Sequence, residues 1–127
     1  MVEDFKNAHR RHWDDAELLR GEQRLANADQ LYGISAECGL KAIMSRIGLR
    51  AIPKRHVDQL WPEFETHLHG RVESSEYGLA GSPFGDWRID DRYAHQDGFD
   101  GARVASHRRG AKRVNALVKQ AEKGLGL

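Results

Sequence analysis

One stretch of the chain, residues 23–47, limits the possible folds most strongly, because its apolar side chains recur at helical spacing around much of a cylinder. A helix that is apolar over so broad a surface is expected to lie at the centre of a bundle. Gly33, Ala36 and Gly39 would let a neighbouring backbone approach closely, and tight packing would offset the ~1 kcal/mol that each glycine costs within a helix. The apolar surface comprises Leu25, Ala28, Leu31, Tyr32, Ile34, Ala36, Leu40, Ile43, Met44 and Ile47.

The rest of the chain predicts further helices, and no segment shows the alternating apolar pattern of a β-strand. Asp100 is a suitable N-cap for the last helix. The sequence therefore predicts an all-α, four- or five-helix antiparallel bundle that forms a single domain over residues 1–127. The expected helices are 3–20, 23–47, 57–68, a short one at 86–96, and 100–123.

Residues 70–84 carry the weakest periodicity of the chain and are rich in glycine, with Pro83 close to their end. We expect a mobile loop here, with low local stability, which limited proteolysis should cut first. Phe84 and Trp87 are expected to anchor the far end of this loop in the core.

The charge balance and the cysteine content exclude several classes of protein. The net charge is +1, too small for a strong, general nucleic-acid binder, so any site for a polyanion must come from local clusters. No apolar run is long enough to cross a bilayer, the first residues lack the pattern of a signal peptide, and a single cysteine, Cys38, allows no internal disulfide. These features favour a cytoplasmic protein with no membrane partner.

Four short motifs follow one another along the predicted helices. They are Trp13-Asp14-Asp15-Ala16-Glu17-Leu18-Leu19, Ala36-Glu37-Cys38-Gly39-Leu40-Lys41, His56 followed by Leu60-Trp61, and Trp87 followed by Arg92-Tyr93. In this order they resemble the first helix, the A-E-x-x-L-K core, the H-x-x-x-L segment and the W-x-x-x-x-R-Y element of small prokaryotic HEPN domains. The resemblance covers residues 8–121 and implies a helical bundle of HEPN type.

The residues of the second motif also have a reading without the family. Glu37 precedes Lys41 by four residues, an orientation that favours an ion pair within a helix. We prefer a structural role for this pair, in buried polar contacts or a dimer seam, over a catalytic one. Cys38 is interpreted as a small core residue. A homodimer is expected, because the second and fourth helices carry more apolar and small-residue surface than a compact four-helix monomer needs, and the resemblance points the same way.

The resemblance also implies one candidate active site. Catalytic HEPN ribonucleases carry an arginine, four to six further residues, and then a histidine, and Arg88 and His95 match this pattern with six residues between them. If the segment is helical, the two residues return to nearly the same face, ~10.5 Å apart along the axis. Arg92 falls on that face too, so one helix could present two guanidinium groups and an imidazole to a cleft.

This set suits RNA cleavage that needs no metal ion or other cofactor. A histidine side chain ordinarily titrates near ~6.5, so it can accept a proton from a ribose 2′-OH or donate one to the leaving oxygen. Arginine is permanently charged and can bind phosphate oxygens through two parallel hydrogen bonds. The resemblance thus implies a candidate toxin-like, metal-independent endoribonuclease, with Arg88 and His95 as catalytic residues and Arg92 as a substrate-binding residue.

Several residues leave the alternatives open. Asp90 and Asp91 would repel a phosphate, and Arg92-Tyr93 could be structural, with Arg92 paired to a carboxylate such as Glu37 and Tyr93 packed. The alternative is a non-catalytic HEPN module that binds a nucleotide, an RNA, or a nucleotidyltransferase-type antitoxin partner. No metal site is expected, because the pair His67 and His69 lacks the further ligands that a stable zinc site needs.

Overall fold

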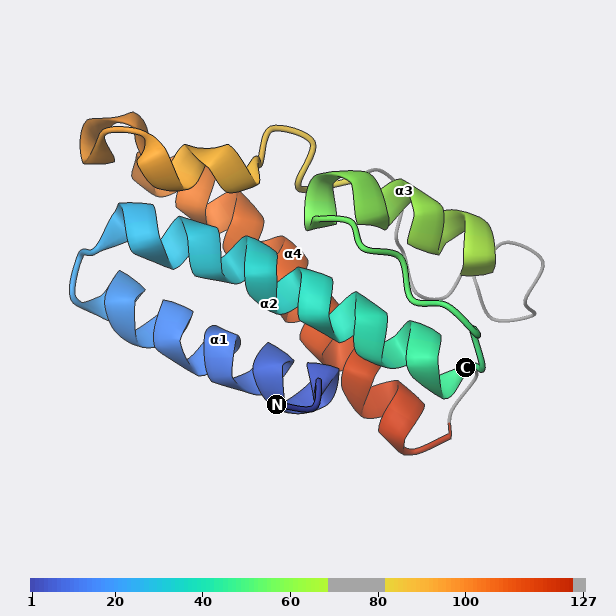
Figure 1. Ribbon diagram of the computed structural model, residues 1–127. Helices are drawn as coiled ribbons and strands as arrows, with labels where there is room; N and C mark the ends of the chain where they lie inside the picture. Colours follow the sequence, from blue (N-terminus) through green and yellow to red (C-terminus); the bar gives the residue numbers. More distant parts are fainter. Residues whose placement is uncertain (69–81, 125–127) are drawn as a thin grey trace.

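The computed structural model describes residues 1–68 and 82–124, and within these residues the chain is helical and contains no strand. Four α-helices form the bundle, and two short 3-10 turns precede the last of them (Figure 1). The expected all-α fold is therefore confirmed. The elements are α1 (Phe5–Gly21), α2 (Leu25–Arg46), α3 (Val57–Leu68), η2 (Ile89–Tyr93), η3 (Gln96–Gly98) and α4 (Gly101–Glu122).

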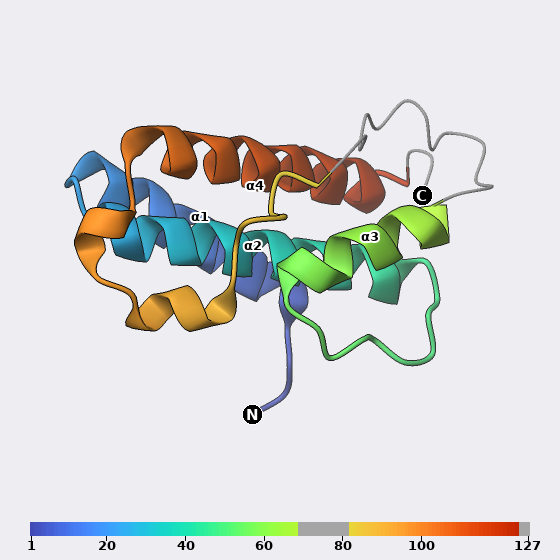
Figure 2. The same cartoon turned by 90° about the horizontal axis from the view of Figure 1, so that it is seen from above.

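Helix α2 lies at the centre, with α1, α3 and α4 packed around it (Figures 1 and 2). Helix α1 is antiparallel to α2, as expected, but α2 and α4 run in the same direction. Glu17 of α1 bonds both Tyr32 of α2 and Arg108 of α4, which places these two residues level with each other. Farther along, Gly39 of α2 lies against Val114 of α4. The expected antiparallel order is wrong for this pair, because the chain that follows α2 crosses back to the end of the bundle where α2 begins.

The two glycines of α2 are packed closely against other residues of the same chain. Any Cβ at Gly33 would overlap the indole of Trp87, and one at Gly39 would meet Val114 and His9. These contacts let the large aromatic side chain of Trp87 reach 0% exposure. They also remove part of the reason for expecting a homodimer, because the small-residue surface already has partners inside the monomer. The homodimer itself stays a prediction.

The expected short helix at 86–96 is wrong. The structure has η2 and η3 instead, separated by extended backbone at Ala94 and His95. Each turn begins with its own side-chain cap: a carboxylate oxygen of Asp91 accepts the N–H of Arg88, the residue before η2, at 3.2 Å, and Nδ1 of His95, the residue before η3, accepts the N–H of Asp97 at 3.1 Å. Because a new turn starts at each cap, the segment forms two short turns and no continuous helix.

Two other predictions about this half of the chain are confirmed. Phe84 and Trp87 are both fully buried, as expected for anchors in the core. Asp100 is the N-cap of α4, and its carboxylate accepts the N–H of Arg103 at 2.8 Å. Most of the loop predicted at 70–84 lies outside the described residues. Among the described helices, none combines the length and the apolar character needed to span a bilayer.

Candidate functional site

The three residues singled out by the sequence lie on one exposed stretch, which we call the surface segment 88–98. Arg88, Arg92 and His95 are all exposed there, whereas the flanking residues Trp87 and Phe99 are buried. The segment lies beside the first half of α2 (Figure 1), and the side-chain amide of Gln30 donates to the carbonyl of Arg88 at 3.0 Å. Buried anchors at both ends therefore hold a short polar stretch on the surface.

Arg88 uses some of its hydrogen-bond donors within its own loop. Its Nη1 donates to the carbonyls of Gly85 and Trp87 at 2.8 and 2.7 Å, and lies 3.4 Å from a carboxylate oxygen of Asp58 on α3. The side chain is nevertheless 56% exposed. Its remaining donors, on Nε and Nη2, have no partner among the described residues. Arg88 thus braces the loop with one nitrogen and retains two for another group.

His95 has one engaged ring nitrogen and one without a partner in the described part of the chain. Because Nδ1 accepts the N–H of Asp97, the neutral ring carries its hydrogen on Nε2. A carboxylate oxygen of Asp97 lies 3.7 Å from the same Nδ1. If Nδ1 becomes protonated, this carboxylate is the nearest acceptor for it. Asp97 therefore offers a group to either neutral tautomer of the ring: its backbone N–H when the ring hydrogen is on Nε2, and its carboxylate when that hydrogen is on Nδ1.

Arg92 and Tyr93 form an exposed stacked pair. The guanidinium of Arg92 lies 4.7 Å from the centre of the Tyr93 ring, and its Nη2 donates to the Tyr93 hydroxyl at 2.9 Å. Tyr93 is 76% exposed. The suggested pairing of Arg92 with Glu37 is wrong, because Glu37 bonds Lys41 at 3.2 Å and His56 at 2.9 Å. The suggested packing of Tyr93 in the core is wrong as well.

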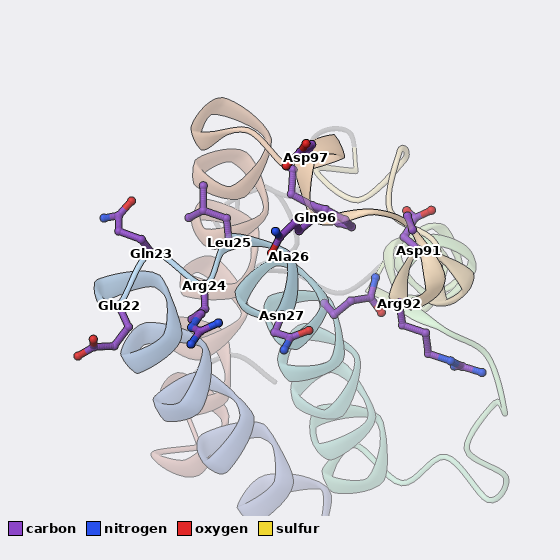
Figure 3. Close-up of a pocket in the computed structure, with 13 residues that line it drawn as sticks. Glu22, Gln23, Arg24, Leu25, Ala26, Asn27, Asp91, Arg92, Gln96 and Asp97 are labelled. Atoms are coloured by element: carbon purple, nitrogen blue, oxygen red, sulfur yellow. The ribbon is translucent and has the colours of Figure 1, made fainter.

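The structure therefore keeps the three residues on one segment but does not place them on one helix face. Their separate roles in chemistry stay predictions. A groove of about 710 Å³ borders this segment, between the α1–α2 connection and the turns η2 and η3 (Figure 3). Arg24, Glu22 and Asp97 give its walls mixed charge, and Arg92 points away from the opposite wall.

A connected network of five charged residues lies next to this surface and was missed by sequence reasoning. His107 and Asp29 both have 0% exposure, and Nδ1 of His107 lies 2.6 Å from the carboxylate of Asp29. Nε2 of His107 lies 2.7 Å from the carboxylate of Asp86, whose side chain is 65% exposed. Arg103 contacts the carboxylates of Asp29 and Asp86 at 3.4 Å and that of Asp91 at 3.0 Å. We call these residues the ionic clasp: Asp29, Asp86, Asp91, Arg103 and His107.

His107 is held in its charged form, because each of its ring nitrogens faces a carboxylate. Burial by itself would lower the pKa of His107, but the hydrogen bond and charge of Asp29, followed by those of Asp86, outweigh burial and raise this pKa. Burial would likewise raise the pKa of Asp86, yet the hydrogen bond from His107 and the charges of His107 and Arg103 lower it. Each partner therefore stabilises the charged form of the other.

Two signals in the sequence could have indicated the clasp. Asp29 is an acidic residue within the most apolar helix of the chain, and Arg103 and His107 stand four residues apart on the last helix, on one face. A charge in such a position requires a partner. The sequence did not show which of the many basic residues supplies it.

No metal centre emerges from the geometry. Across residues 1–68 and 82–124 no set of three or more histidine, cysteine or acidic side chains is arranged to hold a metal ion. His69, one half of the pair considered above, lies outside the described residues. Cys38 is buried, and burial followed by the nearby charge of Glu37 raises the pKa of its thiol to about 11, so it is a poor nucleophile.

Comparisons with known proteins return no match for this chain, whether against protein-family models, curated proteins or solved structures.

Proposed function

We propose that this chain is a HEPN-like protein that binds RNA and cleaves it without a metal ion. His95 would transfer protons, and Arg88 and Arg92 would bind phosphate. One observation carries the proposal: all three side chains are exposed on the surface segment 88–98, and Nε2 of His95 has no partner among the described residues. The resemblance to small prokaryotic HEPN domains supports the same chemistry.

The contacts of His95 suit proton transfer. To act as a base, His95 takes the other neutral tautomer: Nδ1 gives up the N–H of Asp97, carries the ring hydrogen and faces the carboxylate of Asp97 3.7 Å away, which leaves a lone pair on Nε2. That lone pair can accept the proton of a ribose 2′-OH. The 2′-oxygen then attacks phosphorus, the P–O5′ bond breaks, and the 5′-oxygen leaves with a proton from an acid. A homodimer, which the resemblance implies, would supply a second His95 as that acid. The products carry a 2′,3′-cyclic phosphate and a 5′-hydroxyl.

Arg92 and Tyr93 add a surface for RNA. Aromatic rings and guanidinium planes are the groups on which unpaired bases stack, and this pair offers both next to the candidate catalytic residues. Single-stranded RNA is therefore the proposed substrate. A toxin of this kind would be held inactive by a nucleotidyltransferase-type antitoxin.

A second function is favoured by the surroundings of Arg88. Its Nη1 braces the loop through the carbonyls of Gly85 and Trp87, and the carboxylates of Asp90 and Asp97 lie on the same surface segment. Such surroundings weaken phosphate binding. In this alternative the chain is a non-catalytic HEPN-like module that binds RNA, a nucleotide or a nucleotidyltransferase partner through the same surface.

Incubation of purified protein with single-stranded RNA in EDTA separates the two functions. The ribonuclease proposal predicts products with 2′,3′-cyclic phosphate ends, no activity in His95→Ala, and full activity in His67→Ala, which removes an exposed histidine of α3. Arg88→Ala should lower the rate by the ~10²–10³-fold typical of losing one donor to a developing oxyanion. Arg88→Lys should not restore it fully, because an ammonium group lacks the planar fork. Wild-type protein that leaves several RNAs intact across pH, with His95→Ala indistinguishable from it, would refute the ribonuclease proposal and favour the module.

A further inference from the structure

The ionic clasp joins three parts of the fold that are far apart in sequence. Asp29 belongs to α2, Arg103 and His107 belong to α4, and Asp86 and Asp91 flank Arg88 in the chain. Besides its ion pairs, Arg103 donates through Nη2 to the backbone carbonyl of Asp86 at 2.9 Å. The clasp therefore reaches from the middle of the bundle to the stretch that carries a candidate catalytic residue.

The buried pair of the clasp, Asp29 and His107, is energetically unfavourable as core packing. Taking Asp29 and His107 out of water costs free energy that their mutual attraction often fails to recover, and apolar pairs of similar size are commonly at least as stable. Stability alone is thus a weak reason for this pair. Its distinctive property is that His107 presents a second N–H, at Nε2, to the exposed carboxylate of Asp86.

Neighbouring contacts reinforce the same attachment. The ring of Phe84 stacks on that of His107, with 5.4 Å between centres and 17° between planes. The indole N–H of Trp87 donates to the backbone carbonyl of Asp29 at 3.2 Å. Asp91 accepts both the guanidinium of Arg103 and the backbone N–H of Arg88. The backbone of Arg88 is consequently fixed on both of its sides.

We propose that Asp29 and His107 are positioning residues: through Asp86, Arg103 and Asp91 they lock residues 84–91 onto the α2–α4 pair and set the direction in which Arg88 is presented. Their importance for RNA cleavage rests on the proposed function, but the locking of the segment does not. Two cationic groups, the imidazolium of His107 and the guanidinium of Arg103, hold the three carboxylates together.

The lock has a defined pH range. Two carboxylates face His107: that of Asp29 from α2 and that of Asp86 from the loop before α4. The guanidinium of Arg103, which lies on α4 with His107, contacts both of these carboxylates. Since the pKa of His107 is raised, the lock persists below that pKa and loosens as pH rises through it. Since the pKa of Asp86 is lowered, the lock also loosens as pH falls through that value. Between the two limits residues 84–91 stay attached.

Nuclear magnetic resonance of the full chain without RNA tests this inference. Both ring N–H signals of His107 should be present at pH 7, and one of them should be lost on alkalinisation together with a loss of amide protection, relative to the intrinsic exchange rate at each pH, across residues 84–91. Asp86→Asn keeps the size of the side chain and removes its charge. It should speed exchange of these amides about tenfold while exchange in the core of α2 stays unchanged. Glu17→Gln is the matched control, because it removes a carboxylate paired with α4 at Arg108, away from the clasp.

Several results would overturn the inference. These are a single ring N–H on His107 at pH 7, exchange at 84–91 that is the same in Asp86→Asn as in wild type, or an alkaline loss of amide protection, relative to the intrinsic rate, that persists in His107→Gln. Should His107→Gln fail to fold, Asp86→Asn and Asp91→Asn on the exposed side still decide the matter. Because exchange is measured without RNA, an inactive wild-type protein would refute the ribonuclease proposal and leave this result standing.

Discussion

Gly33 offers the most direct test of how the bundle is packed, through the substitution Gly33→Ala. In an exposed helix this change would stabilise the chain by ~1 kcal/mol, because alanine has the higher helix propensity. At Gly33 the new methyl group would overlap the indole of Trp87, which has 0% exposure and cannot swing into solvent without losing its burial. The contact must therefore be relieved by moving one of the two elements.

The expected magnitude follows from the groups involved. Overpacking of a filled core costs ~1–3 kcal/mol, and displacing Trp87 would also weaken its hydrogen bond to the carbonyl of Asp29, 3.2 Å away, which is worth ~0.5–1.5 kcal/mol. After subtracting the propensity gain, we expect the free energy of unfolding to fall by ~1–3 kcal/mol. For a domain of this size that corresponds to a Tm lower by roughly 4–12 °C.

Urea denaturation and thermal unfolding would measure the change. Gly21→Ala is the matched control, because no atom lies within 4 Å of a Cβ placed at this helical position, and it should leave stability unchanged or slightly raised. Trp87→Phe, which shrinks the ring, should partly rescue Gly33→Ala, so the double variant should lose less than the sum of the two single changes. A Gly33→Ala protein as stable as the Gly21→Ala protein would refute the packing described here.

Three further predictions follow from the contacts. Glu17→Gln should lower the free energy of unfolding at pH 7. The difference in this free energy between variant and wild type should shrink as pH falls through the pKa of Glu17, because the hydrogen bond from Arg108 lowers this pKa and its stabilising contribution is lost on protonation. Urea titrations from pH 7 to pH 3 would show whether the difference shrinks. Cys38 should react with a thiol reagent at pH 7.5 far more slowly than in urea-unfolded chain, since its thiol is buried with a pKa of about 11, and equal rates would contradict its burial. Arg92→Ala should leave Tm nearly unchanged but weaken binding to single-stranded RNA measured by fluorescence anisotropy, because Arg92 is exposed and its partner among the described residues is the exposed Tyr93; a large drop in Tm would show that it has a buried partner.

Periodicity determined the helices of this protein because a helix that buries one face must repeat its apolar residues every three to four positions. In residues 23–47 the apolar positions cover so much of the helix surface that neighbouring helices must pack around it, and α2 lies at the centre of the bundle. The N-cap at Asp100 and the anchors Phe84 and Trp87 could be predicted for the same kind of reason, since each depends on a residue and its near neighbours.

The segment around Arg88 and His95 shows where such reasoning stops. A spacing of seven residues suits an α-helix, but the carboxylate of Asp91 caps the start of η2 and the ring of His95 caps the start of η3, so the segment forms two separate turns. These local bonds are individually modest, so the burial of Trp87 and Phe99 on either side contributes to the outcome. The candidate residues were visible in the sequence, whereas their relative orientation was not.

The ionic clasp and the direction of α4 were decided by tertiary structure alone. His107 lies 78 residues from Asp29 and 21 residues from Asp86. The local sequence indicates that Asp29 needs a partner but does not indicate that these three residues meet. Their meeting depends on α4 running alongside α2 in the same direction, which in turn depends on the path of the long connection between these helices. Sequence determines which residues need a partner, because a buried charge cannot remain alone, and only the packing of distant segments determines which partner each of them finds.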